Sequence, residues 1–113
     1  MARPISRDEL RTLMDRGAVT VVETLPLQYY EQGHLPGALH LGNEHVAGIA
    51  PRLLPNKDAT IVTYCASTTC QNSAQAARAL ETAGYTDVRE YIEGKADWES
   101  AGLPLETGVT ATV

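Results

Sequence analysis

Apolar and polar positions follow two periods along the chain, one typical of amphipathic helices and one typical of buried strands. Ser6 and Glu9 form a capping box, and the apolar residues after them predict a first helix that ends at Gly17. Short runs of apolar and β-branched residues predict strands over 19–22, 38–41, 60–64 and 88–92.

Helical patterns fall between these strands. They cover a short segment from Pro26 to Gly33, a partly helical segment over 43–54 that Pro51 breaks, a longer helix over 74–83 and a short one over 96–101. We expect Asn72 and Gln75 to cap the longer helix and Gly84 to end it. Its inner stripe consists of small or apolar residues, Ala76, Ala77 and Leu80. Strands and helices that alternate in this way predict an α/β fold, a mainly parallel sheet with helices on both faces.

Composition narrows the class of protein. The 113 residues, 43% hydrophobic and 20% charged, predict one folded domain over 1–106 with a loosely held tail over 107–113. A net charge of −5 argues against nucleic-acid binding, and no apolar run reaches the roughly 20 residues of a membrane helix. With no export signal visible and only two cysteines, we expect a cytoplasmic protein with two thiols rather than a disulfide framework.

Cys65 is the candidate for chemistry because it follows the clearest predicted strand. Ligands bind at the carboxyl ends of the strands in open α/β sheets. The loop over 66–70 then leads into a helix, and its backbone N–H groups, together with the start of the helix, favour an anion such as a thiolate. From spacing alone, a second interpretation stays open, in which Cys65 is a small apolar filler at the end of a strand.

Several segments match one family in order and spacing. They are Val21-Val22-Glu23, Tyr30-x-x-Gly33-His34-Leu35-Pro36-Gly37-Ala38, Ile61-Val62-Thr63-Tyr64-Cys65, Ala76-Ala77-Arg78-Ala79-Leu80, Ala83-Gly84-Tyr85-x-x-Val88, Glu93-Gly94, Trp98 and Ala101-Gly102-Leu103-Pro104. From about Ile5 to Glu106, the chain resembles a single-domain rhodanese, a sulfurtransferase homology domain. The second cysteine in its loop is similar to that of one subgroup of the family.

The resemblance implies a fold, a reaction and a site. The fold is a five-stranded, mainly parallel sheet flanked by helices. Cys65 would take a sulfane sulfur from thiosulfate, polysulfide or a persulfide and pass it to a thiol, a carrier protein or another nucleophile. Neither a cofactor nor a metal is implied. The substrate would lie against the active loop, which consists of Ala66, Ser67, Thr68, Thr69 and Cys70.

The chain departs from the family in its charges. Basic residues are usual at the first and fifth loop positions, where this chain has Ala66 and Cys70, and their absence argues against thiosulfate. Cys70 is either a resolving thiol that attacks persulfidated Cys65 or a residue that packs under the loop. We expect Glu23 to brace the loop or a helix terminus, with a general-base role second, and Lys95 to lean toward the pocket mouth.

The remaining polar candidates favour structural roles. His34, His40 and His45 do not fit zinc spacing with the cysteines, and in the family pattern His34 belongs to a turn. Arg78 is expected to be a solvated or sheet-flanking cation rather than a ligand, and Trp98 is expected in the core. The alternative to an enzyme is a binding or redox-sensing module that uses the Cys65/Cys70 pair.

Overall fold

Parallel strands form a sheet of order β1-β5-β4-β2-β3 in the computed structural model, which describes residues 3–42 and 46–108. The strands are β1 (Arg3–Pro4), β2 (Thr20–Glu23), β3 (Leu39–His40), β4 (Thr60–Tyr64) and β5 (Asp87–Tyr91). The helices are α1 (Arg7–Asp15), α2 (Leu27–Gln32), α3 (Val46–Leu53), α4 (Asn72–Thr82) and α5 (Gly94–Ser100). The predicted α/β class is therefore confirmed.

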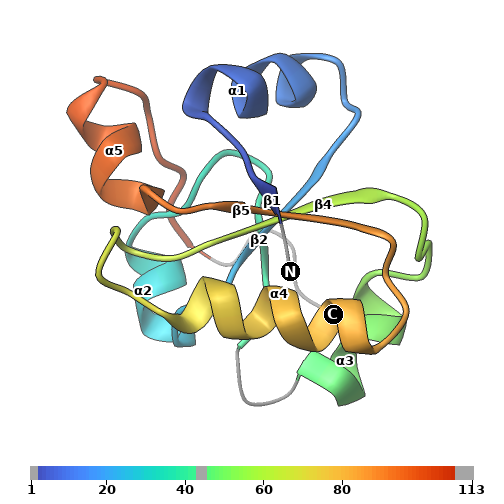
Figure 1. Cartoon of the computed structure of the whole chain (residues 1–113). Coiled ribbons are helices and arrows are strands. Elements are labelled where there is room, and N and C mark those ends of the chain that lie inside the picture. Colours follow the sequence, from blue (N-terminus) through green and yellow to red (C-terminus); the bar gives the residue numbers. More distant parts are fainter. Residues whose placement is uncertain (1–2, 43–45, 109–113) are drawn as a thin grey trace.

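Helices cover both faces of the sheet, as the sequence predicts. Figure 1 shows α1 and α5 above the sheet and α3 and α4 below it. Neighbouring residues of a strand point to opposite faces, so Val21 packs in the cluster with Leu10 and Trp98, while Val22 packs with Leu80. The small residues of the α4 stripe are buried, which lets this helix lie close to the sheet.

The capping box of α1 is confirmed. The Ser6 Oγ accepts the Glu9 amide at 3.1 Å, and the Glu9 carboxylate accepts the Ser6 amide at 3.4 Å. Gly84 ends α4 with φ +101°, a backbone conformation that favours glycine.

Two local predictions about helix ends are wrong. Pro51 does not break its helix but lies inside α3, because a proline removes one donor and the ladder resumes where the Leu54 amide donates to the Ala50 carbonyl at 2.7 Å. Asn72 does not cap α4. Gln71 occupies that position in helical backbone geometry, so its side chain makes no capping hydrogen bond.

The first strand was not predicted from the hydrophobic pattern. Arg3 and Pro4 pair with Arg89 and Glu90 of β5, and the Ile5 amide extends the pairing to the Glu90 carbonyl at 3.0 Å. Proline is tolerated there because β1 is an edge strand.

The C-terminal segment is tied down as far as the structure describes it. His34 and Glu106 exchange two backbone hydrogen bonds of 2.9 and 2.8 Å, and the Gly108 amide donates to the Glu31 carbonyl at 2.8 Å. Most of the predicted loose tail, residues 109–113, lies outside the described residues.

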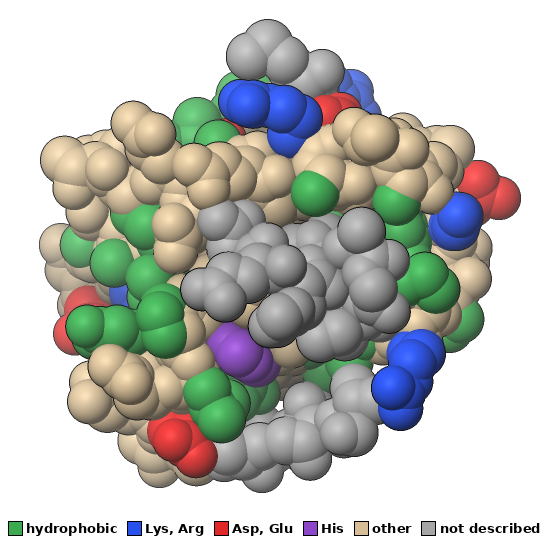
Figure 2. All heavy atoms as spheres, turned by 90° about the horizontal axis from the view of Figure 1, so that it is seen from below, with side chains coloured by type: hydrophobic (Ala, Val, Ile, Leu, Met, Phe, Trp, Pro, Cys, Tyr) green, Lys and Arg blue, Asp and Glu red, His purple; other side chains and the backbone are tan. Residues whose placement is uncertain are grey.

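The underside of the molecule shows no basic patch among its coloured side chains. On the underside, Figure 2 shows the coloured Lys and Arg side chains standing apart from one another rather than forming one basic patch. Within residues 3–42 and 46–108, no helix has the length and apolar character needed to cross a bilayer. The features that point to chemistry lie at the carboxyl edge of the sheet.

Candidate active site

Three neighbouring strands end together at one edge of the sheet. Parallel pairing places Glu23 of β2 beside Tyr64 of β4, and Tyr64 beside Tyr91 of β5. Cys65 is the next residue after β4, and its loop passes between α5 and α2 before α4 begins (Figure 1). This is the edge at which open α/β sheets bind ligands.

Cys65 and Cys70 are joined by a disulfide, with Cα atoms 6.2 Å apart. The prediction of two free thiols is therefore wrong for this structure, because the loop turns back far enough to bring the Cα atoms within disulfide range. Cys65 is only 1% exposed, whereas Cys70 is half-buried. The Cys70 sulfur is thus on the more accessible residue of the pair.

The loop holds its own shape through short-range hydrogen bonds. The Cys70 amide donates to the Ser67 carbonyl at 3.1 Å, and the hydroxyls of Ser67 and Thr69 lie 3.1 Å apart. For the amides of Ala66 through Thr69, the described part of the chain offers no hydrogen-bond acceptor. Donors of this kind can hold an anion or a terminal sulfur.

The start of α5 binds the first two carbonyls of the loop through backbone hydrogen bonds. The Lys95 amide donates to the Cys65 carbonyl at 3.0 Å, and the Ala96 amide donates to the Ala66 carbonyl at 2.9 Å. Gly94 permits this approach, because a Cβ at that position would lie 2.4 Å from the Cys65 carbonyl oxygen. The position of Cys65 therefore depends on α5 as well as on β4.

Glu23 is fully buried beside Tyr64, the residue before Cys65. The Tyr64 hydroxyl donates to Oε1 of Glu23 at 2.8 Å, and the Lys95 Nζ lies 2.9 Å from Oε2 at an angle outside that of a hydrogen bond. Burial, followed by the charge of Glu23, raises the pKa of Tyr64 far above its usual range, so the hydroxyl stays protonated and can donate.

Lys95 does not replace the missing loop cation. Its charge is paired with Glu23, it also donates to the Tyr29 carbonyl at 2.9 Å, and its side chain is 12% exposed. Lys95 does line the hollow beside Ala66, but its ammonium is paired with the buried Glu23, so the prediction that it partly replaces the lost loop charge is wrong. No sequence pattern signalled the contact between these distant residues.

The histidines have structural contacts. The ring of His34 is fully buried and stacks on Tyr30 with centroids 3.9 Å apart, and its Nδ1 lies 2.8 Å from the Tyr30 carbonyl. The Nε2 of His40 lies 2.7 Å from the Leu25 carbonyl, and His45 lies outside the described residues. The side chains that the structure describes include no group of three residues arranged to hold a metal.

Two further candidates lie where the sequence predicts. Arg78 is exposed on α4. Trp98 is buried in the core, and its Nε1 donates to the Pro104 carbonyl at 2.9 Å.

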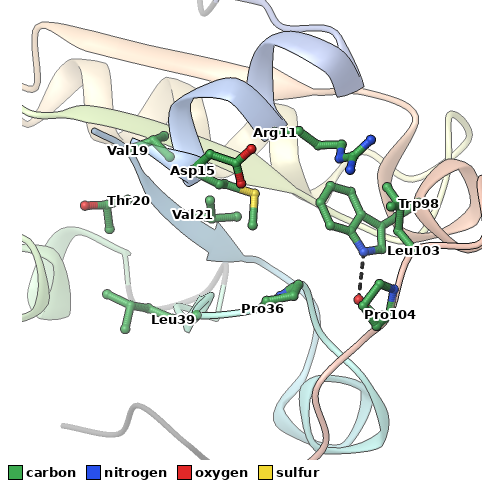
Figure 3. A pocket seen from close by; sticks show the side chains of 12 residues that line it. Arg11, Asp15, Val19, Thr20, Val21, Pro36, Leu39, Trp98, Leu103 and Pro104 are labelled. Carbon is green, nitrogen blue, oxygen red and sulfur yellow. Dashed lines mark hydrogen bonds between the residues drawn. The ribbon is translucent and has the colours of Figure 1, made fainter. Parts of the chain in front are cut away.

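A separate cavity of about 610 Å³ lies on the side of the sheet that α1 covers (Figure 3). Met14, Val21, Leu39 and Trp98 contribute apolar side chains to its mixed wall, and Arg11 reaches over it from α1. None of the residues lining it belongs to the cysteine loop. No sequence pattern predicted this cavity, and its lining contains no cysteine, serine, lysine or histidine.

The comparison with known families agrees with the geometry. The family described as "Rhodanese-like domain" matches residues 6–101, and the chain belongs to this family. The five-stranded parallel sheet and the family resemblance inferred from the motifs are therefore both confirmed.

One curated relative carries the name of a transcriptional regulator. The chain is 35% identical over 104 residues to a Mycobacterium tuberculosis protein named HTH-type transcriptional regulator Rv0324, covering 92% of this chain and 45% of that protein. The chain thus spans less than half the length of this curated relative.

Two solved structures share the fold. The human single-domain sulfurtransferase TSTD1 has 21% identity and a TM-score of 0.79, covering 88% of this chain and 97% of that one. A rhodanese with anions from E. coli has 27% identity and a TM-score of 0.67, covering 80% and 100%.

Proposed function

We propose that the chain is a sulfurtransferase that carries a sulfane sulfur as a persulfide on Cys65. The observation that carries this proposal is the position of Cys65, at the carboxyl end of a central strand and at the start of a loop of uncharged residues. Membership of the rhodanese-like family supports it. Without cofactor or metal, the reaction needs only a thiolate and donors that hold the sulfur in place.

The reaction consists of two displacements at sulfur. The Cys65 thiolate attacks the outer sulfur of the donor, a new S–S bond forms, and the remainder of the donor leaves with its electron pair as a thiolate or sulfite. An acceptor thiolate then attacks the outer sulfur of the persulfide and releases the Cys65 thiolate. The amides of Ala66 to Thr69 are proposed to hold the transferred sulfur.

The donor is proposed to be a polysulfide or a persulfide rather than thiosulfate. A sulfonate is best held by an arginine fork, and the loop has Ala66 and Cys70 at the two positions that are usually basic. Lys95, whose amide binds the Cys65 carbonyl, has its charge already paired with Glu23. Backbone donors alone hold thiosulfate more weakly.

Cys70 is proposed to act as the resolving thiol. Its thiolate attacks the Cys65 Sγ of the persulfide, the Cys65–Cys70 bond forms, and hydrosulfide leaves with the electron pair. The disulfide in the structure supports this step. Two equivalents of a cellular thiol then reopen it by exchange, which agrees with a cytoplasmic location.

A second candidate function is a redox-sensing or binding module. The Cys65–Cys70 disulfide and a relative named as a transcriptional regulator favour this function. In such a module, opening and closing of the disulfide would change the loop surface without sustained sulfur transfer.

Intact-mass measurement after incubation with glutathione persulfide or polysulfide tests the proposal. The reduced protein should gain one sulfur on Cys65 or release sulfide and form the disulfide. Cys70→Ser should accumulate the persulfide, and Cys65→Ser should reduce sulfur transfer to background because the nucleophile is gone. Thiosulfate should react more slowly than either donor.

The outcomes separate the two functions. Equal turnover by Cys65→Ser would remove the mechanism. A protein that takes up no sulfur from any donor, yet forms and loses the disulfide reversibly, would be the redox-sensing module.

A further inference from the structure

Large apolar side chains are exposed around the cysteine loop. Leu27 and Tyr29 of α2 are each 45% exposed, and Ile92, directly after β5, is 40% exposed. The strands before these residues, β2 and β5, flank β4 in the sheet, so all three residues follow strands that end at the edge where Cys65 leaves β4. Single exposed apolar residues are ordinary, but a gathering of them beside a reactive loop is typical of an interaction surface.

A hollow of about 430 Å³ joins one of these residues, Tyr29, to the loop. It is bordered by Ala66 of the loop, by Leu25 and Tyr29 from the β2–α2 segment, and by Leu105 near the C-terminal end. Its volume fits one or two side chains of a partner. A small inorganic anion does not need such a wall.

Acidic side chains lie at this edge. Glu99 lines the hollow, and Glu93, outside its lining, is exposed next to Ile92. The lysine in the same wall, Lys95, is paired with the buried Glu23. In the part of the chain that the structure describes, neither Glu93 nor Glu99 has a cation within ion-pair distance. This surface therefore attracts a basic partner and repels an anionic one.

The accessibility of the two cysteines sets the point of attack. Cys65 is 1% exposed, so an incoming thiolate meets the half-buried Cys70 first. Attack on the Cys70 Sγ forms a mixed disulfide with the partner, and the Cys65 thiolate leaves with the electron pair. A second partner thiolate then attacks the partner sulfur of the mixed disulfide and releases the Cys70 thiolate, leaving the partner oxidised and the chain reduced.

We infer that this surface, formed by Leu25, Leu27, Tyr29, Ile92, Glu93 and Glu99, docks a protein whose reacting cysteine is flanked by apolar and basic side chains. The inference rests on the proposed function, because it names the class of partner that accepts sulfur from Cys65 or reopens its disulfide. Specificity comes from the flanks of the partner's thiol, since the loop itself carries no charge.

Disulfide exchange with three synthetic peptides tests this inference. The peptides are Lys-Leu-Cys-Leu-Lys, Glu-Leu-Cys-Leu-Glu and Lys-Gly-Cys-Gly-Lys, and the oxidised protein is the substrate. Each rate is divided by the rate of the same peptide with bis(2-hydroxyethyl) disulfide, a neutral reference that corrects for thiol reactivity. The basic apolar peptide should exceed the acidic one about tenfold and the glycine peptide about threefold.

Variants assign these preferences to residues. Glu93→Gln combined with Glu99→Gln should remove most of the charge preference, and Tyr29→Ser should remove most of the apolar preference. The matched control is Asp15→Asn, an exposed carboxylate on α1 away from the loop, which should leave both ratios unchanged. Circular dichroism verifies that each variant is folded.

Equal normalised rates for the three peptides would overturn the inference, as would an equal loss of preference in Asp15→Asn. The proposed function is tested separately by sulfur uptake on Cys65. Peptide preference without sulfur uptake would support the docking surface and contradict the sulfurtransferase function. Sulfur uptake without peptide preference would support the function and contradict the docking surface.

Discussion

Gly94 lets α5 approach the cysteine loop closely because glycine has no Cβ. Its φ of +64° is a conformation that side chains rarely adopt, and a Cβ there would lie 2.4 Å from the Cys65 carbonyl oxygen. The two following amides bind the carbonyls of Cys65 and Ala66. The close contact between α5 and the loop thus requires glycine on both conformational and steric grounds.

Gly94→Ala should lower the free energy of unfolding by about 2–4 kcal/mol, because a left-handed conformation and a steric contact both oppose the side chain. Sulfur loading on Cys65 should fall as well, since the loop must shift. Urea unfolding and intact mass measure the two effects.

Gly102→Ala is the matched control for this substitution. Its φ of +75° is similar, but a Cβ there meets nothing within 4 Å, so only the conformational cost of about 1 kcal/mol applies. Equal destabilisation by both substitutions would show that the contact with Cys65 is not what requires glycine at position 94.

The sequence pattern predicted the position of Cys65 but not the side-chain contacts around it. A cysteine after a strongly apolar strand and before a helix could be placed at the carboxyl edge of the sheet from the order of elements alone. The Glu23–Lys95 pair could not, because it joins residues that lie far apart in the sequence and depends on where the fold places the start of α5. Tyr64 likewise reads as one more strand residue until its hydroxyl meets Glu23.

At the level of elements, Asp87 joins three strands at the start of β5. Its carboxylate accepts the Thr60 hydroxyl of β4 at 2.7 Å and the Arg89 Nε at 3.1 Å, and it lies 3.5 Å from the Arg3 guanidinium of β1. The Thr60 hydrogen bond, followed by those from Arg89, holds the pKa of Asp87 below its usual value. This carboxylate therefore stabilises the order β1-β5-β4 in its charged form.

Stability should consequently fall on acidification. The folded state binds the proton less readily than the unfolded chain, so the contribution of Asp87 is complete above the unfolded pKa of about 4 and is lost as pH falls through the lower folded value. Urea unfolding from pH 7 to pH 2 measures this loss. Asp87→Asn should be less stable at pH 7 and should flatten the acid limb, whereas Asp15→Asn should keep it. An unchanged acid limb in Asp87→Asn would contradict this role.

Elements with dense local signals are also those that the sequence predicted best. The strand over 60–64 coincides with β4, because five consecutive residues favour strand and its neighbours on both faces are helices. β1 has two residues, one of them proline, and exists only because β5 offers a free edge to pair with. The sequence predicted the start of α4 two residues too late, because Asn72 and Ser73, whose side chains are typical of caps, lie inside its first turn.

At the scale of the whole molecule, the disulfide couples stability to redox state. Cys65 and Cys70 are separated by five positions, and closing a loop of this size restricts the unfolded chain by about 2 kcal/mol. Because the bond stabilises the folded state by that free energy, folding stabilises the bond by the same amount. This corresponds to roughly a 30-fold larger equilibrium constant for forming the disulfide in the folded chain than in the unfolded chain. The folded loop thus holds the two sulfurs together more readily than the unfolded peptide does.

Oxidised protein should therefore unfold at a higher urea concentration than reduced protein, by about 2 kcal/mol at 25 °C, with a nearly unchanged dependence on urea because so short a loop alters little exposed surface. Cys70→Ser, which cannot form the bond, should unfold identically with and without reductant. A reduced protein as stable as the oxidised one would show that native contacts are strained by the bond to the same extent that it restricts the unfolded chain. In that case folding would give the loop no preference for the disulfide, and the resolving role of Cys70 would have to rest on kinetics alone.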